Sequence, residues 1–471
     1  MKYKHYDLDI PADDPFAYCK LGRKTNAEVL TQIVQNYADG FILSINGEWG
    51  TGKTTFMKMW AAYLKLQHIN TLYFNAWEND FISDPMVALL GELRQLTTTR
   101  TKETLASILD IGSRIAVNAI PALAKGIVKH YCGEDLADAV KDALNAGSEI
   151  FKTEILEYET KKDKLKTFKE KLSTYIQETN PDHPLVFIVD ELDRCRPDYA
   201  VEVLERIKHF FSIKGIVFVL SIDKEQLCNS IRGRYGSDRI NTEDYLRRFI
   251  DVEYLLPKPD IKSYCQYLYE YFEFDSFLET EDRKRHRDFS SDGDQLLRCA
   301  QEIAEGKNLS LRQIEKIFAH TRLVLRACQS DYYIFPRATF ILVCIRAIDL
   351  DFYLKIINRQ LTIQELSDYV PNVFPERMFI DQYSDTTIKI HKSIFYGLAE
   401  LFYCYDRSFD TYSSQLTIQD TNSKENKLTF KIPYVDEKEF LDAIIRCRHF
   451  YRGITWTHNI KSIDLLNYIV D

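Results

Sequence analysis

Eight residues, Gly47-Glu-Trp-Gly-Thr-Gly-Lys-Thr54, have the types and the spacing that most clearly predict chemistry. They fit the pattern G-x-x-x-x-G-K-[ST], whose glycines let backbone N–H groups turn inward and cradle phosphates at the amino terminus of a helix. Lys53 is expected to reach the β- and γ-phosphates, and the Thr54 hydroxyl to bind Mg²⁺. The segment therefore predicts a nucleoside triphosphate site whose wall is completed by Gly47, Glu48, Trp49, Gly50, Thr51 and Gly52.

An acidic pair ends a second informative segment, the apolar run 185–191 with the sequence LVFIVDE. At the end of a buried strand, Asp190 is placed to hold Mg²⁺, directly or through water. Glu191 is placed to orient and deprotonate the attacking water as a general base. Such a run also occurs where a strand simply meets solvent. Its combination with the upstream glycine-rich segment predicts hydrolysis, with Glu191 and Lys53 as catalytic residues.

Five polar side chains further along the chain are candidates for phosphate contacts. Ser221 and Asp223 end an apolar run expected to lie beside the first strand, where either would sense hydrolysis or simply terminate a strand. Arg247 and Arg248 precede the last apolar run. The permanently charged fork of arginine suits transition-state charge, and an ordinary surface ion pair fits these residues too. Arg312 comes early in a helix, where a cation opposes the helix dipole, so it indicates either the nucleotide or a local carboxylate.

The elements that must position these residues can be read from five apolar runs, rich in β-branched and aromatic residues, which predict strands. Segments between them have helical spacing, as in 199–211, where apolar residues recur every three or four positions. Strands that alternate with helices predict an α/β fold with a parallel, doubly wound sheet. The five predicted strands are 41–46, 71–77, 185–191, 216–223 and 252–256.

Changes in composition predict three regions. Residues 1–257 are expected to form the nucleotide-binding domain, with a helical insertion at about 80–182. The charged stretch 154–177 within it predicts either a solvated helix face or a coiled-coil arm. Residues 258–330 read as a helical, lid-like region. Residues 331–471 read as a mainly helical domain with one β-hairpin, in which QLTIQD and KLTFKI flank a polar turn containing Asn422 and Asn426.

The bulk composition narrows the function classes. A chain of 471 residues with a net charge of −9 does not have the general basic footprint of a nucleic-acid binder, so that partner stays uncertain. Its ten cysteines show no C-x-x-C pair and predict reduced core thiols rather than a zinc site. The start lacks a signal-peptide pattern, and charges interrupt the apolar stretch 105–128. We therefore expect a cytoplasmic protein, with membrane attachment unlikely from the sequence.

Together these motifs resemble the KAP family of P-loop NTPases. GEWGTGKTT (47–55) is similar to that family's tryptophan-containing phosphate loop, which extends the expected nucleotide contacts to Thr55. YFNAWEND is similar to its strand ending in Asn-Ala-Trp, and IVDELDRCRPDYAVEVLERIKHFF to its acidic strand and the helix that follows. GIVFVLSIDKEQL and YLRRFIDVEYLLP resemble the succeeding segments. The early DDPFAYCKLGR resembles the entry segment, in which Leu21, Gly22 and Arg23 would border the adenine.

The resemblance implies a fold of the additional-strand, catalytic-glutamate class and ATP as the nucleotide. Members often carry transmembrane helices in the insertion, where this chain has no credible span. Members often have Asp as the second acidic residue, where this chain has Glu191. Some prokaryotic members are similar to a phage-exclusion protein, which implies phage defence or signalling by analogy alone.

Three interpretations follow. The first is an ATP-hydrolysing molecular switch that works through its insertion or C-terminal domain, as a homo-oligomer or with a protein partner. An Arg247 or Arg248 that acts across an interface would require oligomers. The second is a scaffold that holds ATP without significant turnover, against which the intact Asp190–Glu191 pair counts. The third is an NTPase stimulated by nucleic acid, which the net charge disfavours.

Overall fold

The computed structural model divides the chain into two compact units, one formed by residues 7–258 and one that contains the residues from Pro259 onward. Each unit is described by itself. The residues that the structure describes are 9–36, 40–82, 84–116, 154–211, 213–237, 239–284, 291–326, 335–379, 393–406, 415–419, 426–450 and 463.

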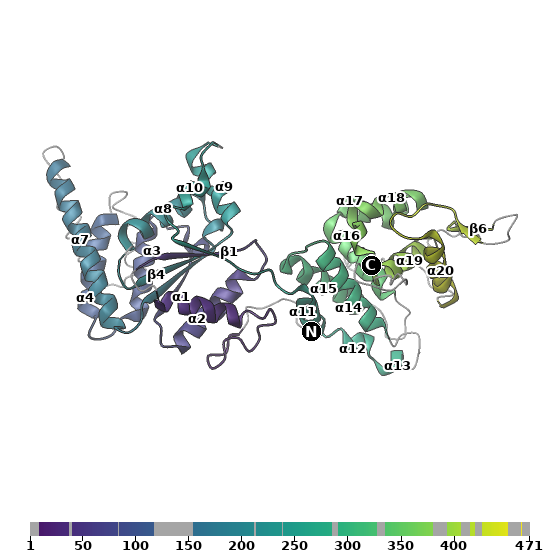
Figure 1. The fold of residues 1–471 in the computed structure, drawn as a ribbon, viewed down its shortest axis with the longest axis horizontal. Helices are drawn as coiled ribbons and strands as arrows, with labels where there is room; N and C mark the ends of the chain where they lie inside the picture. Colours follow the sequence, from purple (N-terminus) through teal and green to yellow (C-terminus); the bar gives the residue numbers. More distant parts are fainter. Residues whose placement is uncertain are drawn as a thin grey trace, which may run out of the picture. The chain divides into compact units, whose positions relative to one another are not determined.

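A five-stranded parallel sheet forms the centre of the first unit (Figure 1). The strand order is β2-β3-β4-β1-β5, so β4 lies between the strand that precedes the glycine-rich loop and the strand that ends in the acidic pair. This inserted strand defines the additional-strand class and confirms the predicted fold. All five strands occur where the sequence predicts them, although β2 ends two residues earlier, and β3, β4 and β5 one residue earlier, than expected. Their bounds are β1 Ile42–Asn46, β2 Thr71–Asn75, β3 Leu185–Asp190, β4 Ile216–Ile222 and β5 Val252–Leu255.

Helices cover both faces of the sheet, as the doubly wound pattern predicts. Helices α1 (Lys24–Asn36) and α2 (Lys53–Leu66) cover one face, where Phe56 and Trp60 pack on alternate residues of β1, β3 and β4. The other face is covered by α3, α4, α7, α8 and α9, and Figure 1 shows α3 and α8 on the side of the sheet away from α2. A hydrophobic core therefore packs against each face of the sheet, and this packing fixes the positions of the strand ends.

The chain between β2 and β3 is helical in its described part. It contains η1 (Trp77–Asn79), α3 (Pro85–Glu92), η2 (Leu93–Leu96), α4 (Lys102–Ala116) and α7 (Glu154–Thr179). The charged stretch belongs to α7, where Phe168, Leu172 and Tyr175 are buried in the core, Glu170 is exposed, and Lys171 donates to the hydroxyl of Ser107 in α4. The helix thus packs along α4.

The chain between β3 and β5 supplies the remaining helices of this unit. They are η3 (Leu192–Arg194), α8 (Pro197–Arg206), a π-helical turn at Ile207–Phe211, α9 (Lys224–Tyr235) and α10 (Thr242–Leu246). Helix α9 begins at Asp223, whose carboxylate accepts a hydrogen bond from the N–H of Gln226, and ends at Gly236 with a φ of 63°.

The second unit is mainly helical and is built around α16 (Pro336–Ile348), which is buried almost all round and packs on α14, α15 and α19. Strands β6 (Thr417–Gln419) and β7 (Asn426–Leu428) pair antiparallel at the position of the expected hairpin. Asn426, expected in its turn, begins β7, and Asn422 lies outside the described residues. The helices are α11 (Ile261–Tyr271), α12 (Asp275–Leu278), α13 (Glu281–Lys284), α14 (Asp292–Gly306), α15 (Leu311–Arg326), α16, α17 (Leu350–Ile357), α18 (Ile363–Val373), η6 (Glu376–Met378), α19 (Ser393–Asp406) and α20 (Glu437–Phe450).

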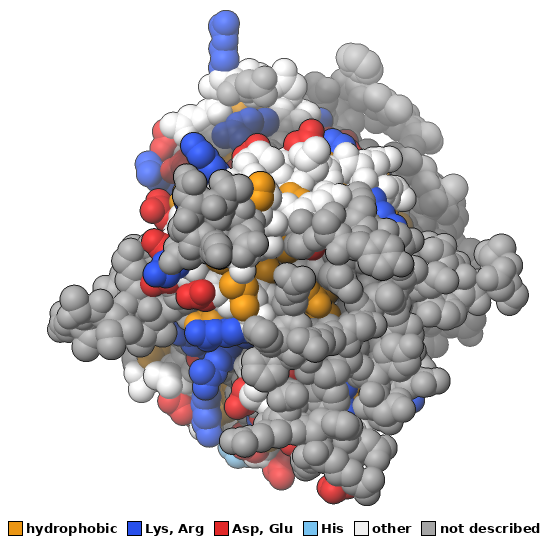
Figure 2. All heavy atoms as spheres, turned by 90° about the vertical axis from the view of Figure 1, so that its right-hand side faces the viewer, with side chains coloured by type: hydrophobic (Ala, Val, Ile, Leu, Met, Phe, Trp, Pro, Cys, Tyr) orange, Lys and Arg blue, Asp and Glu red, His pale blue; other side chains and the backbone are white. Residues whose placement is uncertain are grey.

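On the face drawn in Figure 2, the described lysine and arginine side chains lie among aspartate and glutamate side chains. Within the described residues, we find no helix with the length and apolar character that a membrane crossing requires.

Candidate functional site

The glycine-rich segment forms a loop between β1 and α2, at the carboxyl edge of the sheet. Gly50 and Gly52 have φ values of 77° and 81°, a region in which a residue with a Cβ atom is strained. These two residues let the loop curl back over the start of α2, which begins at Lys53. The loop is anchored to the sheet because the Gly47 N–H donates to the carbonyl of Ile222, at the end of β4.

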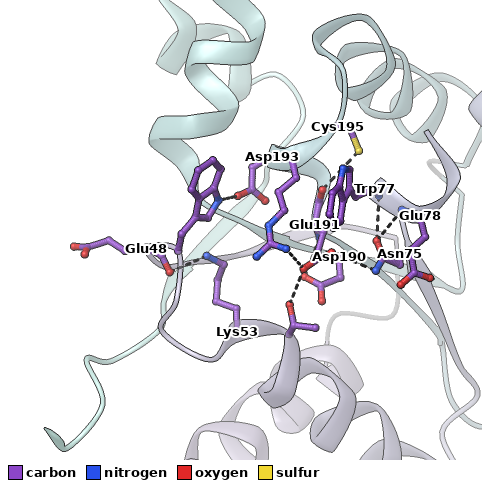
Figure 3. A network of polar contacts seen from close by, with 12 residues as sticks. Glu48, Lys53, Asn75, Trp77, Glu78, Asp190, Glu191, Asp193 and Cys195 are labelled. Atoms are coloured by element: carbon purple, nitrogen blue, oxygen red, sulfur yellow. Dashed lines mark hydrogen bonds and ion pairs between the residues drawn. The ribbon is translucent and has the colours of Figure 1, made fainter. Parts of the chain in front are cut away.

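Lys53 is the cation of this loop and is buried. Its Nζ donates to the carbonyl of Gly47 and, at 3.1 Å, to that of Glu48 (Figure 3). Burial lowers the pKa of Lys53, an effect that the carboxylates of Asp193, Asp223 and Asp190 oppose. An ammonium group bound only to neutral carbonyls in a desolvated loop is a strong site for a phosphate oxygen.

Asp190 ends β3 and is only 1% exposed. Its Oδ2 accepts a 2.7 Å hydrogen bond from the hydroxyl of Tyr73 in β2, and its Oδ1 accepts from the Glu191 N–H at 2.9 Å. Burial, followed by the nearby Asp190 carboxylate, raises the pKa of Tyr73 far above its ordinary value. The phenol therefore stays protonated and donates, which holds the Asp190 carboxylate in one orientation.

Glu191 follows in a left-handed backbone conformation, with a φ of 60°, at the start of η3. Its Oε1 lies 2.6 Å from Nη1 of Arg194 and 3.5 Å from the hydroxyl of Thr54. Its Oε2 accepts a 3.3 Å hydrogen bond from the amide of Asn75, at the end of β2. A left-handed conformation is costly for a residue other than glycine, and such strain is concentrated at functional sites.

The loop and the acidic segment, far apart in sequence, meet at this edge of the sheet (Figure 3). Besides the contact between Thr54 and Glu191, the indole Nε1 of Trp49 donates to Oδ2 of Asp193. Burial raises the pKa of Asp193, while the hydrogen bond from Trp49 and the charge of Lys53 oppose that rise. The predicted convergence of the two motifs is thus present as direct side-chain contact.

The entry segment also reaches the loop. Nη2 of Arg23 donates to the carbonyl of Thr51 at 2.8 Å, and its guanidinium lies over the ring of Phe56. Arg23 is 3% exposed, and burial lowers its pKa to about 10. Within the described residues, Nη1 of Arg23 has no hydrogen-bond partner. Leu21 and Gly22 directly precede it, and Gly22 has a φ of 63°; their contact with adenine stays a prediction.

Ser221 and Asp223 lie at the end of β4, as predicted. Ser221 pairs in register with Asp190, and its buried hydroxyl makes no hydrogen bond within the described part of the chain. Asp223 caps α9 and accepts a 3.2 Å hydrogen bond from the Trp49 N–H, so it supports the loop backbone. Contact of either residue with the nucleotide stays a prediction, as it does for exposed Glu48 and Thr55.

Arg247 and Arg248 do not converge on this site within the chain. They precede β5, whose first residue, Val252, pairs with Leu43 near the amino end of β1. At about 3.3 Å per residue, roughly 10 Å of strand separates that level from the phosphate loop. Arg247 is 73% exposed and pairs with Asp244 at 2.8 Å. Parallel strands direct their carboxyl ends to one edge, so residues before β5 must lie at the other.

Arg312 lies in the second unit, exposed in the first turn of α15. The N–H of Gln313 donates to the Ser310 hydroxyl, and the Gln313 side chain accepts from the Ser310 N–H, which caps the helix as the sequence predicts. A role for Arg312 at the nucleotide stays a prediction.

The residues present fit a Mg²⁺-bound triphosphate. Within the described residues, no group of three or more His, Cys, Asp or Glu side chains could hold a metal ion. A magnesium ion bound with a nucleotide needs fewer protein ligands, because phosphates and water complete its shell. The oriented carboxylate of Asp190 and the hydroxyl of Thr54, which lies 3.5 Å from the adjacent Glu191, are such a set. The partnerless Ser221 hydroxyl and the buried Lys53 are donors suited to phosphate.

Four side chains at the site were not singled out from the sequence: Tyr73, Asn75, Asp193 and Arg194. Strand alternation was the available signal for Tyr73, because odd positions of β2 face α2, as Asp190 does. No local signal marks Arg194, whose contacts depend on the tight turn after β3.

A parallel sheet with an inserted β4, a glycine-rich loop on α2 and an acidic pair at the adjoining strand end define a P-loop NTPase fold. The model of the KAP family P-loop domain matches residues 23–368, more than half of the chain. The chain belongs to the KAP family.

Two similar proteins are more distant. The Phage T7 exclusion protein of Escherichia coli (strain K12) is 20% identical over 280 residues, which cover 54% of this chain and 34% of that protein. The chain thus matches about a third of that relative's length. The structure of the Aeropyrum pernix ORC2 protein (ADPNP-ADP complexes) aligns with 94% of this chain and 95% of its own, at 14% identity. Its TM-score of 0.28 adds nothing to the fold argument.

Proposed function

We propose that this protein binds ATP with Mg²⁺ between the loop 47–54 and the pair Asp190–Glu191, and hydrolyses it as a molecular switch. The observation that carries the proposal is the convergence described above. The Thr54 hydroxyl lies 3.5 Å from Glu191, and Asp190 stands next to Glu191 at the end of β3.

Each residue has a distinct expected task. The loop N–H groups and Lys53 would hold the phosphates and neutralise their charge. Glu191 would accept the proton of the attacking water, and Asn75 would orient that carboxylate. The Asn75 amide is itself fixed, because its Oδ1 accepts from the N–H groups of Trp77 and Glu78, which leaves its NH₂ facing Glu191.

Thr54 and Asp190 would hold the magnesium ion. The chemistry supplied by bound Mg²⁺ is neutralisation of charge on the β- and γ-phosphate oxygens. Tyr73 would support this task indirectly, since its 2.7 Å hydrogen bond keeps the Asp190 carboxylate in one orientation.

Single-turnover hydrolysis with protein in excess of ATP tests the proposal. We expect the wild-type protein to release phosphate, Lys53→Ala to lose ATP binding, and Glu191→Gln to bind ATP but release phosphate at least roughly 100-fold more slowly. An intact ATP pool after hours with wild-type protein would favour a nucleotide-bound scaffold. Release by Glu191→Gln at the wild-type rate would refute its role as the base.

We further propose that Arg247 or Arg248 acts on the site of a neighbouring copy, since their position before β5 argues against action within their own chain. This role requires an oligomer. Molecular mass measured with and without an ATP analogue tests it, together with Arg248→Ala. A strictly monomeric protein with full activity excludes the role in trans.

A role in phage exclusion is the biological setting that we propose, by analogy with the relative that carries this function in its name. The test is plating efficiency of a phage panel on cells that express the wild-type chain or Lys53→Ala. Protection that depends on Lys53 supports the role, whereas equal plating on both strains for every phage argues against it.

A further inference from the structure

Arg194 makes the shortest contact to the Glu191 carboxylate. The two residues lie at opposite ends of η3, and the Arg194 N–H also donates to the Glu191 carbonyl at 3.1 Å. Both partners of the ion pair are largely buried, with side-chain exposures of 24% for Arg194 and 11% for Glu191. The pair is therefore closed within one turn of the backbone.

A second contact fixes the guanidinium from its other side. The Arg194 Cζ lies 5.7 Å from the centre of the Trp77 ring, and Trp77 is 51% exposed. The ring attracts the cation while leaving one aromatic face at the surface. Trp77 belongs to η1, and its N–H donates to Oδ1 of Asn75 at the end of β2. Asn75 thus contacts both Trp77 and Glu191.

These contacts occupy the oxygens that a general base needs. Arg194 cannot take over a proton that Glu191 receives from water, because arginine is already fully protonated. Oε1 faces Arg194 and Thr54, and Oε2 faces Asn75. A carboxylate offers about four lone-pair sites, so an attacking water finds one free site on Oε2 and reaches Oε1 only when Arg194 or Thr54 moves away.

We propose that Arg194 is a positioning residue that restrains Glu191, so that opening of their ion pair speeds turnover, and that Trp77 holds Arg194 in the restraining position. The inference rests on the proposed function of Glu191 as the base. It makes the exposed face of Trp77 a place at which a contact from outside would change the rate of hydrolysis.

The test compares kcat, KM and the affinity for a fluorescent, non-hydrolysable ATP analogue in a set of variants. Arg194→Ala removes the ion pair and is expected to raise kcat roughly three- to tenfold, with KM and analogue affinity within about twofold of wild type. Arg194→Lys keeps the charge but not the guanidinium fork, so its kcat should lie between those of the wild-type protein and Arg194→Ala. Trp77→Ala should raise kcat roughly twofold, and Trp77→Phe, which keeps an aromatic ring, by less.

Arg196→Ala is the matched control. Arg196 lies two residues further on, is 63% exposed at its side chain, and bonds to Asp80 rather than to Glu191. Its loss should leave kcat unchanged. In the Glu191→Gln background, Arg194→Ala should also have no effect, because the gain acts through Glu191.

The outcomes separate this inference from the proposed function. If neither the wild-type protein nor Arg194→Ala hydrolyses ATP, the proposed function fails and the inference with it. If the wild-type protein turns over and Arg194→Ala is equal or slower at unchanged analogue affinity, the restraint is refuted while the ATPase stands. If Arg194→Ala does not fold, Trp77→Ala and Arg194→Lys decide: a raised kcat supports the restraint, and an unchanged or lowered kcat refutes it.

Discussion

Replacement of Tyr73 by phenylalanine isolates one hydrogen bond in the site. The ring stays in place between β2 and α2, and only the hydroxyl that donates to Asp190 at 2.7 Å is lost. Asp190 is 1% exposed, so water cannot readily replace the lost donor. The variant therefore leaves one oxygen of the expected magnesium ligand without its partner.

The magnitude follows from the charge of the acceptor. A hydrogen bond to an ionised group contributes about 1.5–3 kcal/mol, and about 1.4 kcal/mol corresponds to a tenfold change in an equilibrium constant. We expect the Mg²⁺ concentration for half-maximal turnover to rise roughly 10- to 100-fold, as is typical when a residue that hydrogen-bonds a metal ligand is lost. Without nucleotide, the loss of about 1–3 kcal/mol should lower the melting temperature by roughly 2–10 °C.

The assay is a Mg²⁺ titration of phosphate release at saturating ATP, combined with thermal unfolding. Tyr63→Phe, which removes the hydroxyl of a half-buried α2 tyrosine packed against Phe16, is the control. An unchanged Mg²⁺ requirement in Tyr73→Phe, or an equal shift in the control, would refute the claim that Tyr73 orients a metal-binding Asp190.

Three further predictions concern the loop, the core and the second unit. Gly50→Ala places a Cβ at a φ of 77°, a strain of about 1–2 kcal/mol in the phosphate-binding conformation, so titration should show the affinity for an ATP analogue falling roughly tenfold. Phe168→Ala removes a fully buried ring that packs edge-on against Phe211, and should cost about 3–5 kcal/mol of unfolding free energy in denaturant titration. Burial raises the pKa of Asp292 from 3.8 to about 7 despite its ion pair with Arg283. Because the pKa of Asp292 is raised in the folded state, its contribution to the free energy of unfolding is full below about pH 4 and is lost as pH rises through about 7. Melting temperatures of Asp292→Asn, measured over this pH range, should lack this decrease.

The sequence predicted the sheet well because strand runs and turn residues are local signals. All five runs became strands, and β4 lies beside β1 as the position of its polar end required. The phosphate loop was equally visible, since its glycines and Lys53 act through spacing within one segment. The pairing of the loop with Asp190 and Glu191 was predicted from the combination of the two motifs, because the carboxyl ends of parallel strands meet at one edge of a sheet.

Contacts that depend on side-chain orientation were beyond the sequence. The pairing of Glu191 with Arg194 arises from a left-handed residue in a 3₁₀ turn, which no propensity favours for glutamate. The direction of β5 places Arg247 at the edge of the sheet away from the phosphate loop. The sequence suggested a catalytic role only because arginine suits transition-state charge. Residues that precede a parallel strand lie at the edge opposite the nucleotide of their own chain, so a role of Arg247 at a nucleotide would concern the site of a neighbouring copy.

A structure of the complex with Mg²⁺ and a non-hydrolysable ATP analogue tests the central proposal most directly. We predict that the phosphates lie against the N–H groups of residues 47–54, and that the metal ion contacts the Thr54 hydroxyl on the side that faces Asp190. Nucleotide bound elsewhere, or a metal ion remote from both residues, would contradict the proposal.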